Sequence, residues 1–270
     1  MITKVLISDK NNLPCEYAST LEAFADGKEY VFKPGVNVIV GNNGSGKSTL
    51  LGMLAMYMMC YGRSKSSIPK VPFIGYLLPD VFGPGGNKIR DGLKICSDYA
   101  GIVYNYVPYT DIMNDKASKF SENAAMVIGG NTMSSGERQI NFLNIMFSRA
   151  FENIDVQFPI SKLKDICQES EIYTEKVNML LRYYKENQDK SIRQEDFEFT
   201  FLIDEPDKNL DIHNIDSITN MFSYHKENTQ IIAAIHNPVV LYKLKKTGNV
   251  NFVEMTEGYM DAIDEIFKNI

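Results

Sequence analysis

The chain has 270 residues, of which 44% are hydrophobic and 23% are charged, a balance that is typical of a globular protein with a substantial core. This composition excludes a disordered chain, a collagen-like repeat and a disulfide scaffold. The formal net charge of −6 argues against a generally basic nucleic-acid-binding surface. Any DNA contact would therefore use a local face of the protein or a partner.

Nothing in the sequence predicts insertion into a membrane or secretion. The longest nearly uncharged apolar stretch, residues 50–61, has about 12 residues, whereas a membrane-spanning helix needs about 20. The first ten residues already contain charged side chains. They lack both the long apolar core and the small-residue cleavage site of a secretory signal. The four cysteines lie far apart and form no metal-binding cluster, so we expect reduced thiols. Together these features predict a cytoplasmic protein.

The first hundred residues predict short strands, a helix and a loop-rich region. Apolar runs separated by turns predict several strands in the first forty residues, and the last strand, residues 36–40, is expected to be buried. Apolar residues then recur at helical spacing over residues 48–62. Residues 62–100 are rich in Gly, Pro and Ser, which predicts long loops with short strands.

The second half of the chain predicts strands and helices in alternation. Residues 102–107 predict a strand, and a polar turn at residues 134–136 leads into an amphipathic helix. Residues 152–198 carry charges of both signs and predict a helical insert, which is either a solvated cap or a platform for a partner. A strand, a helix and a strand are then predicted at residues 199–203, 212–224 and 231–235. This order favours a parallel sheet covered by helices.

The stretch Gly41-Asn-Asn-Gly-Ser-Gly-Lys-Ser48 satisfies the phosphate-loop pattern G-x-x-x-x-G-K-[ST] between a predicted buried strand and a helix. Its backbone N–H groups and the helix N-terminus can face a polyphosphate. We expect Lys47 to contact the β and γ phosphates, Ser48 to ligate Mg²⁺ and Thr49 to lie near the α-phosphate. The sequence thus predicts a nucleoside triphosphate site whose loop is formed by Asn42, Asn43, Gly44, Ser45 and Gly46.

Two acidic residues, Asp204 and Glu205, end the predicted strand at residues 199–203. At the carboxyl end of a parallel strand, Asp204 can reach the Mg²⁺ shell and Glu205 can accept a proton from an attacking water. A solvated turn is the alternative for two adjacent acids, but the phosphate loop makes it the weaker one. A carboxylate that follows the metal-binding Asp favours hydrolysis over transfer to a small acceptor.

Two further stretches, residues 133–139 and 231–238, form a pattern together with the phosphate loop and the segment 204–211 that contains the acidic pair. Met133-Ser-Ser-Gly-Glu-Arg-Gln139 is similar to the signature L-S-G-G-Q, from which Met133 and Ser135 depart. Asp204-Glu-Pro-Asp-Lys-Asn-Leu-Asp211 looks like a Walker B segment that runs into a D-loop. Ile231-Ile-Ala-Ala-Ile-His-Asn-Pro238 matches a strand that ends in a switch histidine. In their order and placement, all four stretches resemble the ABC-type ATPases, which are P-loop NTPases.

This resemblance implies an α/β fold over a single domain at residues 1–270. The expected fold is an ABC ATPase head with a mixed or parallel β-sheet core, an N-terminal antiparallel β-subdomain and a helical signature lobe at about residues 62–150. It also implies ATP and Mg²⁺ as ligands and a head-to-tail homodimer on ATP binding. Each ATP would lie between the phosphate loop of one chain and the signature of the other.

The resemblance also assigns roles to single residues. Ser134 and Gly136 would contact the γ-phosphate bound to the partner, although Ser134 with Glu137 also forms the pattern of a capping box. His236 would approach the same phosphate and hold the attacking water near Glu205. Asp211 would communicate across the dimer.

The chain departs from the family in one place, because no Gln occurs between Ser48 and Arg138 to act as the Q-loop glutamine. Asn105, Tyr109 or a water would take its place. Tyr30 or Phe32 is either a platform for adenine stacking or a core residue. His213 and His225 have no comparable support and are expected on the surface.

The Glu in the signature and the His-Asn-Pro ending resemble the soluble branch of the superfamily. This branch includes RecF, the structural-maintenance-of-chromosomes proteins and the overcoming-lysogenization-defect ATPases. It implies an ATP-driven switch in DNA maintenance or antiphage defence that acts on a separate effector, because no second catalytic constellation is present. The alternative is the nucleotide-binding subunit of an ABC transporter, which the absent glutamine and the late insert disfavour.

Overall fold

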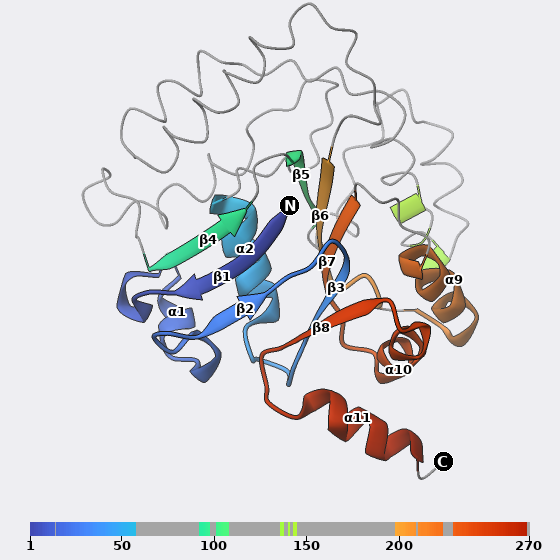
Figure 1. Ribbon diagram of the computed structural model, residues 1–270. Helices are drawn as coiled ribbons and strands as arrows, with labels where there is room; N and C mark the ends of the chain where they lie inside the picture. The colour runs from blue at the N-terminus through green and yellow to red at the C-terminus, as the bar shows by residue number, and fades with distance from the viewer. Residues whose placement is uncertain are drawn as a thin grey trace, which may run out of the picture.

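The computed structural model describes residues 1–13, 15–57, 92–97, 101–107, 136–137, 140, 143–144, 198–208, 210–223 and 229–268. These residues form two sheets with helices packed against them (Figure 1). The strands are β1 (Ile2–Ile7), β2 (Glu29–Val31), β3 (Gly35–Val40), β4 (Leu93–Ser97), β5 (Gly101–Val107), β6 (Glu198–Asp204), β7 (Thr229–Ala234) and β8 (Val250–Glu254). The helices are η1 (Lys10–Asn12), α1 (Glu16–Ser19), η2 (Glu22–Phe24), α2 (Lys47–Tyr57), α9 (Ile212–Ser223), α10 (Pro238–Thr247) and α11 (Tyr259–Lys268).

The larger sheet has the strand order β5-β6-β7-β3-β8, and all its pairings are parallel. Every residue of β3 and β7 is buried. Strands that are buried along their whole length occur where helices or another layer cover both faces of a parallel sheet. This arrangement confirms the α/β class and the parallel pairing that the sequence predicts.

The two faces of the sheet belong to two different cores, because successive side chains of a strand point to opposite sides. On one face, Ile39, Leu202 and Ile232 pack with α2 and the N-terminal strands. On the other face, residues such as Val38 and Phe201 pack with α9, α10 and α11 (Figure 1). The phosphate-loop helix α2 is therefore held between the two sheets.

The smaller sheet has the order β2-β1-β4, with both pairings antiparallel. The buried side chain of Gln230 on β7 ties this sheet to the larger one. Its Oε1 accepts the Ile2 N–H at 2.8 Å, and its Nε2 donates to the carbonyls of Ile2 and Lys33 at 2.7 and 3.0 Å. Since a buried amide is costly unless it is hydrogen-bonded, these contacts stabilise the junction between the sheets.

The predicted strands at residues 36–40, 102–107, 199–203 and 231–235 are confirmed as β3, β5, β6 and β7, and the predicted helix at 212–224 as α9. Within the range predicted as a signature lobe, residues 93–97 and 101–107 form β4 and β5; most of that range, and the predicted insert at 152–198, lie outside the described residues. The elements β8, α10 and α11 were not predicted from the sequence. None of the helices in the described part of the chain is long and apolar enough to span a membrane.

Candidate functional site

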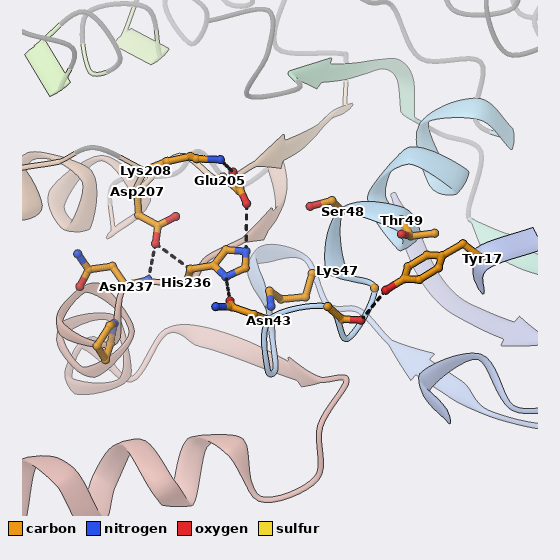
Figure 2. A pocket seen from close by; sticks show the side chains of 13 residues that line it. Tyr17, Asn43, Lys47, Ser48, Thr49, Glu205, Asp207, Lys208, His236 and Asn237 are labelled. Atoms are coloured by element: carbon orange, nitrogen blue, oxygen red, sulfur yellow. Dashed lines mark hydrogen bonds and ion pairs between the residues drawn. The ribbon is translucent and has the colours of Figure 1, made fainter. Parts of the chain in front are cut away.

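A cavity of about 650 Å³ opens at the carboxyl ends of three neighbouring strands, β3, β6 and β7 (Figure 2). The register places Ile39 and Asp204 beside Ala234, so the three strands end at one edge of the sheet. The residues just beyond these strand ends line the cavity together with one residue of α1. They are Tyr17, Asn43, Gly44, Gly46, Lys47, Ser48, Thr49, Glu205, Asp207, Lys208, His236, Asn237 and Pro238.

The phosphate loop connects β3 to α2 through a tight turn that requires glycine. Gly44 and Gly46 have φ values of 78° and 98°, in the left-handed region that L-residues disfavour. A Cβ on Gly46 would also lie 2.5 Å from Cε2 of Phe24, a buried core residue. Packing against the N-terminal core and the backbone conformation therefore both explain this glycine. The resulting loop leaves its backbone free to surround an anion.

Lys47 is the buried cation of the loop, with 3% of its surface exposed. Its Nζ donates to the carbonyl oxygens of Gly41 and Asn42, at 2.7 and 2.9 Å. Burial lowers the pKa of this ammonium, while Glu205 and other nearby carboxylates oppose that shift. A buried ammonium held by uncharged carbonyls suits a polyphosphate, because the ligand supplies the missing negative charge.

Ser48 and Asp204 meet at the start of α2 and the end of β6. The Ser48 hydroxyl donates to Oδ1 of Asp204 at 2.8 Å. Burial raises the pKa of Asp204 to about 6, although the hydrogen bond from Ser48 acts in the opposite direction. A hydroxyl and a carboxylate are hard oxygen ligands of the kind that Mg²⁺ prefers. The residues predicted as metal ligands thus lie together.

These two ligands would not hold a metal ion alone. No group of three or more His, Cys, Asp or Glu side chains in the described part of the chain could bind a metal. Mg²⁺ is commonly bound through one or two protein ligands, with phosphate oxygens and water completing its octahedron. The donor set therefore fits Mg²⁺ that arrives with a nucleotide.

Glu205 follows Asp204 and has an unusual backbone conformation. Its φ of 49° is positive, the only such value for a non-glycine residue in the described part of the chain. Its N–H donates to the carbonyl of Ala234 at 3.1 Å, which holds the turn against β7. Its carboxylate forms an ion pair with Lys208 at 2.5 Å. The turn aims the carboxylate into the cavity, where Figure 2 shows it facing the ring of His236.

His236 lies between Glu205 and the phosphate loop (Figure 2). Its Nε2 lies 3.4 Å from Oε1 of Glu205, and its Nδ1 lies 3.1 Å from Oδ1 of Asn43. Burial, assisted by the charge of Lys47, lowers the pKa of the imidazole, and Asp207 and Glu205 act against that shift. The imidazole therefore lies in contact with both the acidic turn and the phosphate loop.

Five residues that line the cavity received no role in the prediction from sequence: Tyr17, Asp207, Lys208, Asn237 and Pro238. Asp207 is 5% exposed, and its Oδ2 accepts the backbone N–H of His236 at 2.8 Å as well as that of Asn237. Burial raises the pKa of its carboxyl. Its place two residues after Glu205 was a local signal for a role in the site. Tyr17 and Lys208 gave no such signal.

The aromatic residues are arranged differently from the expectation. Tyr30 and Phe32 are 2% and 3% exposed and belong to the N-terminal core, so the core reading is correct and the stacking reading is wrong. Tyr17 lines the cavity instead, with 53% of its surface exposed. Its hydroxyl donates to the Gly44 carbonyl at 3.3 Å. The alternation of apolar residues in the sequence cannot distinguish these two environments.

The predicted signature and D-loop residues lie outside this cavity or outside the described residues. Gly136 is buried in a helical segment, whereas Ser134 and Tyr109 are not described. The Oδ1 of Asp211 accepts the N–H groups of His213 and Asn214 and so caps the start of α9. Asn105 lies in β5, next to β6. His213 is exposed as expected, and His225 is not described.

The family model described as an AAA domain matches residues 21–265, which include every described residue of the cavity except Tyr17. No curated protein matches the chain significantly.

Proposed function

The chain belongs to the AAA-domain family, and from this premise we propose that it binds ATP with Mg²⁺ and hydrolyses it to ADP and phosphate. One observation carries the proposal: the phosphate loop, the Ser48 hydroxyl that donates to Asp204, the Glu205 carboxylate and the His236 imidazole meet at one cavity. Each of these parts has a separate use in phosphoryl transfer to water. Neither a structural turn nor a simple anion site requires all four.

The residues divide the work of hydrolysis between them. The phosphate loop and Lys47 bind the phosphates, and Ser48 and Asp204 would hold Mg²⁺. The bound ion would neutralise negative charge on the phosphate oxygens. Glu205 accepts a proton from the attacking water, and His236 orients that water and the γ-phosphate. The exposed ring of Tyr17 offers a stacking face for the base.

We further propose that ATP joins two copies of the chain head to tail. Three lining residues, Glu205, Lys208 and His236, keep 22%, 45% and 31% of their side-chain surface exposed. A second chain would cover this opening with its signature residues Ser134 and Gly136. Exclusion of water by closure strengthens electrostatic interactions in such a site.

At the level of biology, we propose an ATP-driven switch in DNA maintenance or antiphage defence that acts on a separate protein effector. The Ser-Ser-Gly-Glu signature and the His-Asn-Pro ending support this branch. Because the net charge is −6, we assign any DNA contact to a local face of the dimer or to the effector. The transporter alternative would gain support from a membrane permease as a copurifying partner.

Glu205→Gln tests the hydrolytic role. We expect this variant to bind ATP while its turnover falls at least about 100-fold, because the amide cannot accept the proton. Glu22→Gln, at an exposed position outside the cavity, is the matched control and should hydrolyse normally. An unaltered rate in Glu205→Gln would show that the base assignment is wrong.

The same variant tests the dimer and the partner. Sedimentation with ATP should show a stable dimer of Glu205→Gln, and Ser134→Arg should remain monomeric while it still binds ATP. Affinity purification of Glu205→Gln with ATP should then recover the effector, and nucleic acid if DNA takes part. If the trapped protein remains monomeric at saturating ATP, the dimer proposal fails.

A further inference from the structure

Asp207 is the most deeply buried carboxylate of the cavity, and the chemical roles assigned above leave it unused. It is 5% exposed, less than Asp204 at 8%. Burying a carboxylate destabilises the folded state unless hydrogen bonds compensate for the lost water. The hydrogen bonds that Asp207 makes therefore indicate its role in the folded protein.

Those contacts are concentrated on the segment that carries the imidazole. One oxygen, Oδ2, accepts the backbone N–H groups of both His236 and Asn237 (Figure 2). The other oxygen, Oδ1, is buried and has no hydrogen-bond partner in the described part of the chain. The Asp207 carboxylate thus accepts hydrogen bonds from two consecutive backbone amides just beyond the end of β7.

The segment beyond these amides is held as well. The Oδ1 of Asn237 accepts the N–H of Val239 at 2.9 Å and so caps α10, and Pro238 occupies the first turn of that helix. His236 therefore lies between β7, whose end is paired with its neighbours, and a capped helix. Its backbone has little freedom once Asp207 holds the two amides.

The ring of His236 depends on this backbone for its place. It must reach Glu205 on one side, at 3.4 Å, and Asn43 on the other, at 3.1 Å. Asp207 and Glu205 belong to the same turn. This short segment therefore presents the Glu205 carboxylate to the cavity and also holds the backbone of His236, whose ring faces Glu205. A shift of about 1 Å in a positioned group can lower a rate about 100-fold.

We propose that Asp207 is a positioning residue for hydrolysis, which clamps the backbone of His236 at the distance where the imidazole faces Glu205. This inference rests on the proposed ATPase function and adds a residue that acts through His236. Asp207 does not touch the phosphates or the water in this role. Its effect on turnover is transmitted entirely by the position of the histidine.

Asp207→Ala and Asp207→Asn test the clamp through steady-state kinetics. The Ala variant removes the acceptor, and we expect kcat to fall about 30-fold while KM for ATP changes less than about 3-fold. The Asn carbonyl can accept both amides, so Asp207→Asn should restore kcat to within about 5-fold of the wild type. The matched control is Asp216→Ala, an exposed acid on α9, which should retain full activity.

A double-mutant cycle separates positioning from a general structural effect. If Asp207 acts through His236, Asp207→Ala should lower kcat less than about 2-fold in a His236→Ala background. An additive effect would overturn the proposal, as would a normal kcat in Asp207→Ala or a kcat in Asp207→Asn as low as in the Ala variant. If Asp207→Ala does not fold, Asp207→Ser takes its place, because its hydroxyl is too short to reach both amides.

Hydrogen exchange of the ligand-free protein provides a readout that does not depend on activity. The amides of His236 and Asn237 should exchange at least about 10-fold faster in Asp207→Ala than in the wild type, whereas amides of β3 should not change. Equal protection at the two amides would overturn the clamp. A wild-type protein without ATPase activity but with this exchange pattern would instead contradict the proposed function alone.

Discussion

The Nε2 atom of His236 lies 3.4 Å from Oε1 of Glu205, and each residue lies just beyond the carboxyl end of a strand. The two strands, β7 and β6, are parallel neighbours, with Ala234 paired to Asp204. Parallel pairing therefore brings the imidazole and the carboxylate together although their segments are separated by all of α9. The titration of His236 and the backbone conformation of Glu205 each lead to a separate prediction.

Stability should depend on the titration of His236. Burial lowers the pKa of this imidazole below its ordinary value of 6.5, so below that pH the unfolded chain binds more protons than the folded one. The contribution of His236 to the free energy of unfolding should therefore decrease as the pH falls through 6.5, whereas the raised pKa values of Asp204 and Asp207 act in the opposite direction. His236→Gln removes the histidine contribution alone, so urea unfolding at pH 7.5 and 5.5 should show that the wild type loses stability relative to this variant as the pH falls.

The exposed His213 offers the matched control for this measurement. His213→Gln should leave the difference between the two pH values as it is in the wild type. In an NMR titration, the His236 ring should give a midpoint below 6.5. A midpoint above that value would contradict the prediction, because it would mean that the neighbouring carboxylates outweigh burial.

Glu205 should show backbone strain. A left-handed conformation costs an L-residue about 1–2 kcal/mol, whereas glycine adopts it freely. Since φ at Glu205 is 49°, Glu205→Gly should be more stable than Glu205→Ala by about 1 kcal/mol in chemical unfolding, and both should be inactive. At the exposed Glu22, outside that conformation, the order should reverse. Equal stability of the two Glu205 variants would mean that the turn is not strained in solution.

Tyr17 should contribute to recognition of the base but not of the phosphates. Its exposed ring lines the cavity beside the phosphate loop. Tyr17→Ala should weaken ATP binding about 10-fold, a loss within the range of one base stacked on one aromatic ring. Tyr17→Phe should bind almost normally, because the ring is retained. Calorimetry with inorganic tripolyphosphate should give equal affinities for all three proteins, and a loss there would assign Tyr17 to the shape of the loop instead.

Thr256 should support the phosphate loop from the C-terminal part of the chain. Its Oγ1 accepts the N–H of Asn42 at 3.1 Å, just after β8. Thr256→Val keeps the shape but removes the acceptor, so it should weaken ATP binding about 5-fold, while Thr256→Ser should retain the affinity. Calorimetric titration with ATP and Mg²⁺ measures both. Identical affinities for Val and Ser would show that the hydrogen bond has no effect on the loop.

The phosphate loop, the acidic pair and the strand before His236 were predictable from the sequence, because each is a contiguous pattern whose chemistry lies within a few residues. A buried apolar run that leads into Gly41 or Asp204 indicates both a strand and the polar turn at its carboxyl end. The parallel arrangement was indicated by the alternation of strands and helices. These local signals were sufficient for the fold class and for the phosphate-loop and acidic-turn residues that meet at the cavity.

Tertiary structure alone decided how these parts meet. The order β5-β6-β7-β3-β8 places β7 between the acidic turn and the phosphate loop, so His236 contacts both, and no local pattern specifies this order. Three other hydrogen bonds likewise join segments far apart in the chain. They link Asp207 to His236, Thr256 to Asn42, and Tyr17 to Gly44. Tyr30 became a core residue because the packing of the two sheets buries it. Periodicity reports which face of a strand is apolar, but only the packed fold determines what that face contacts.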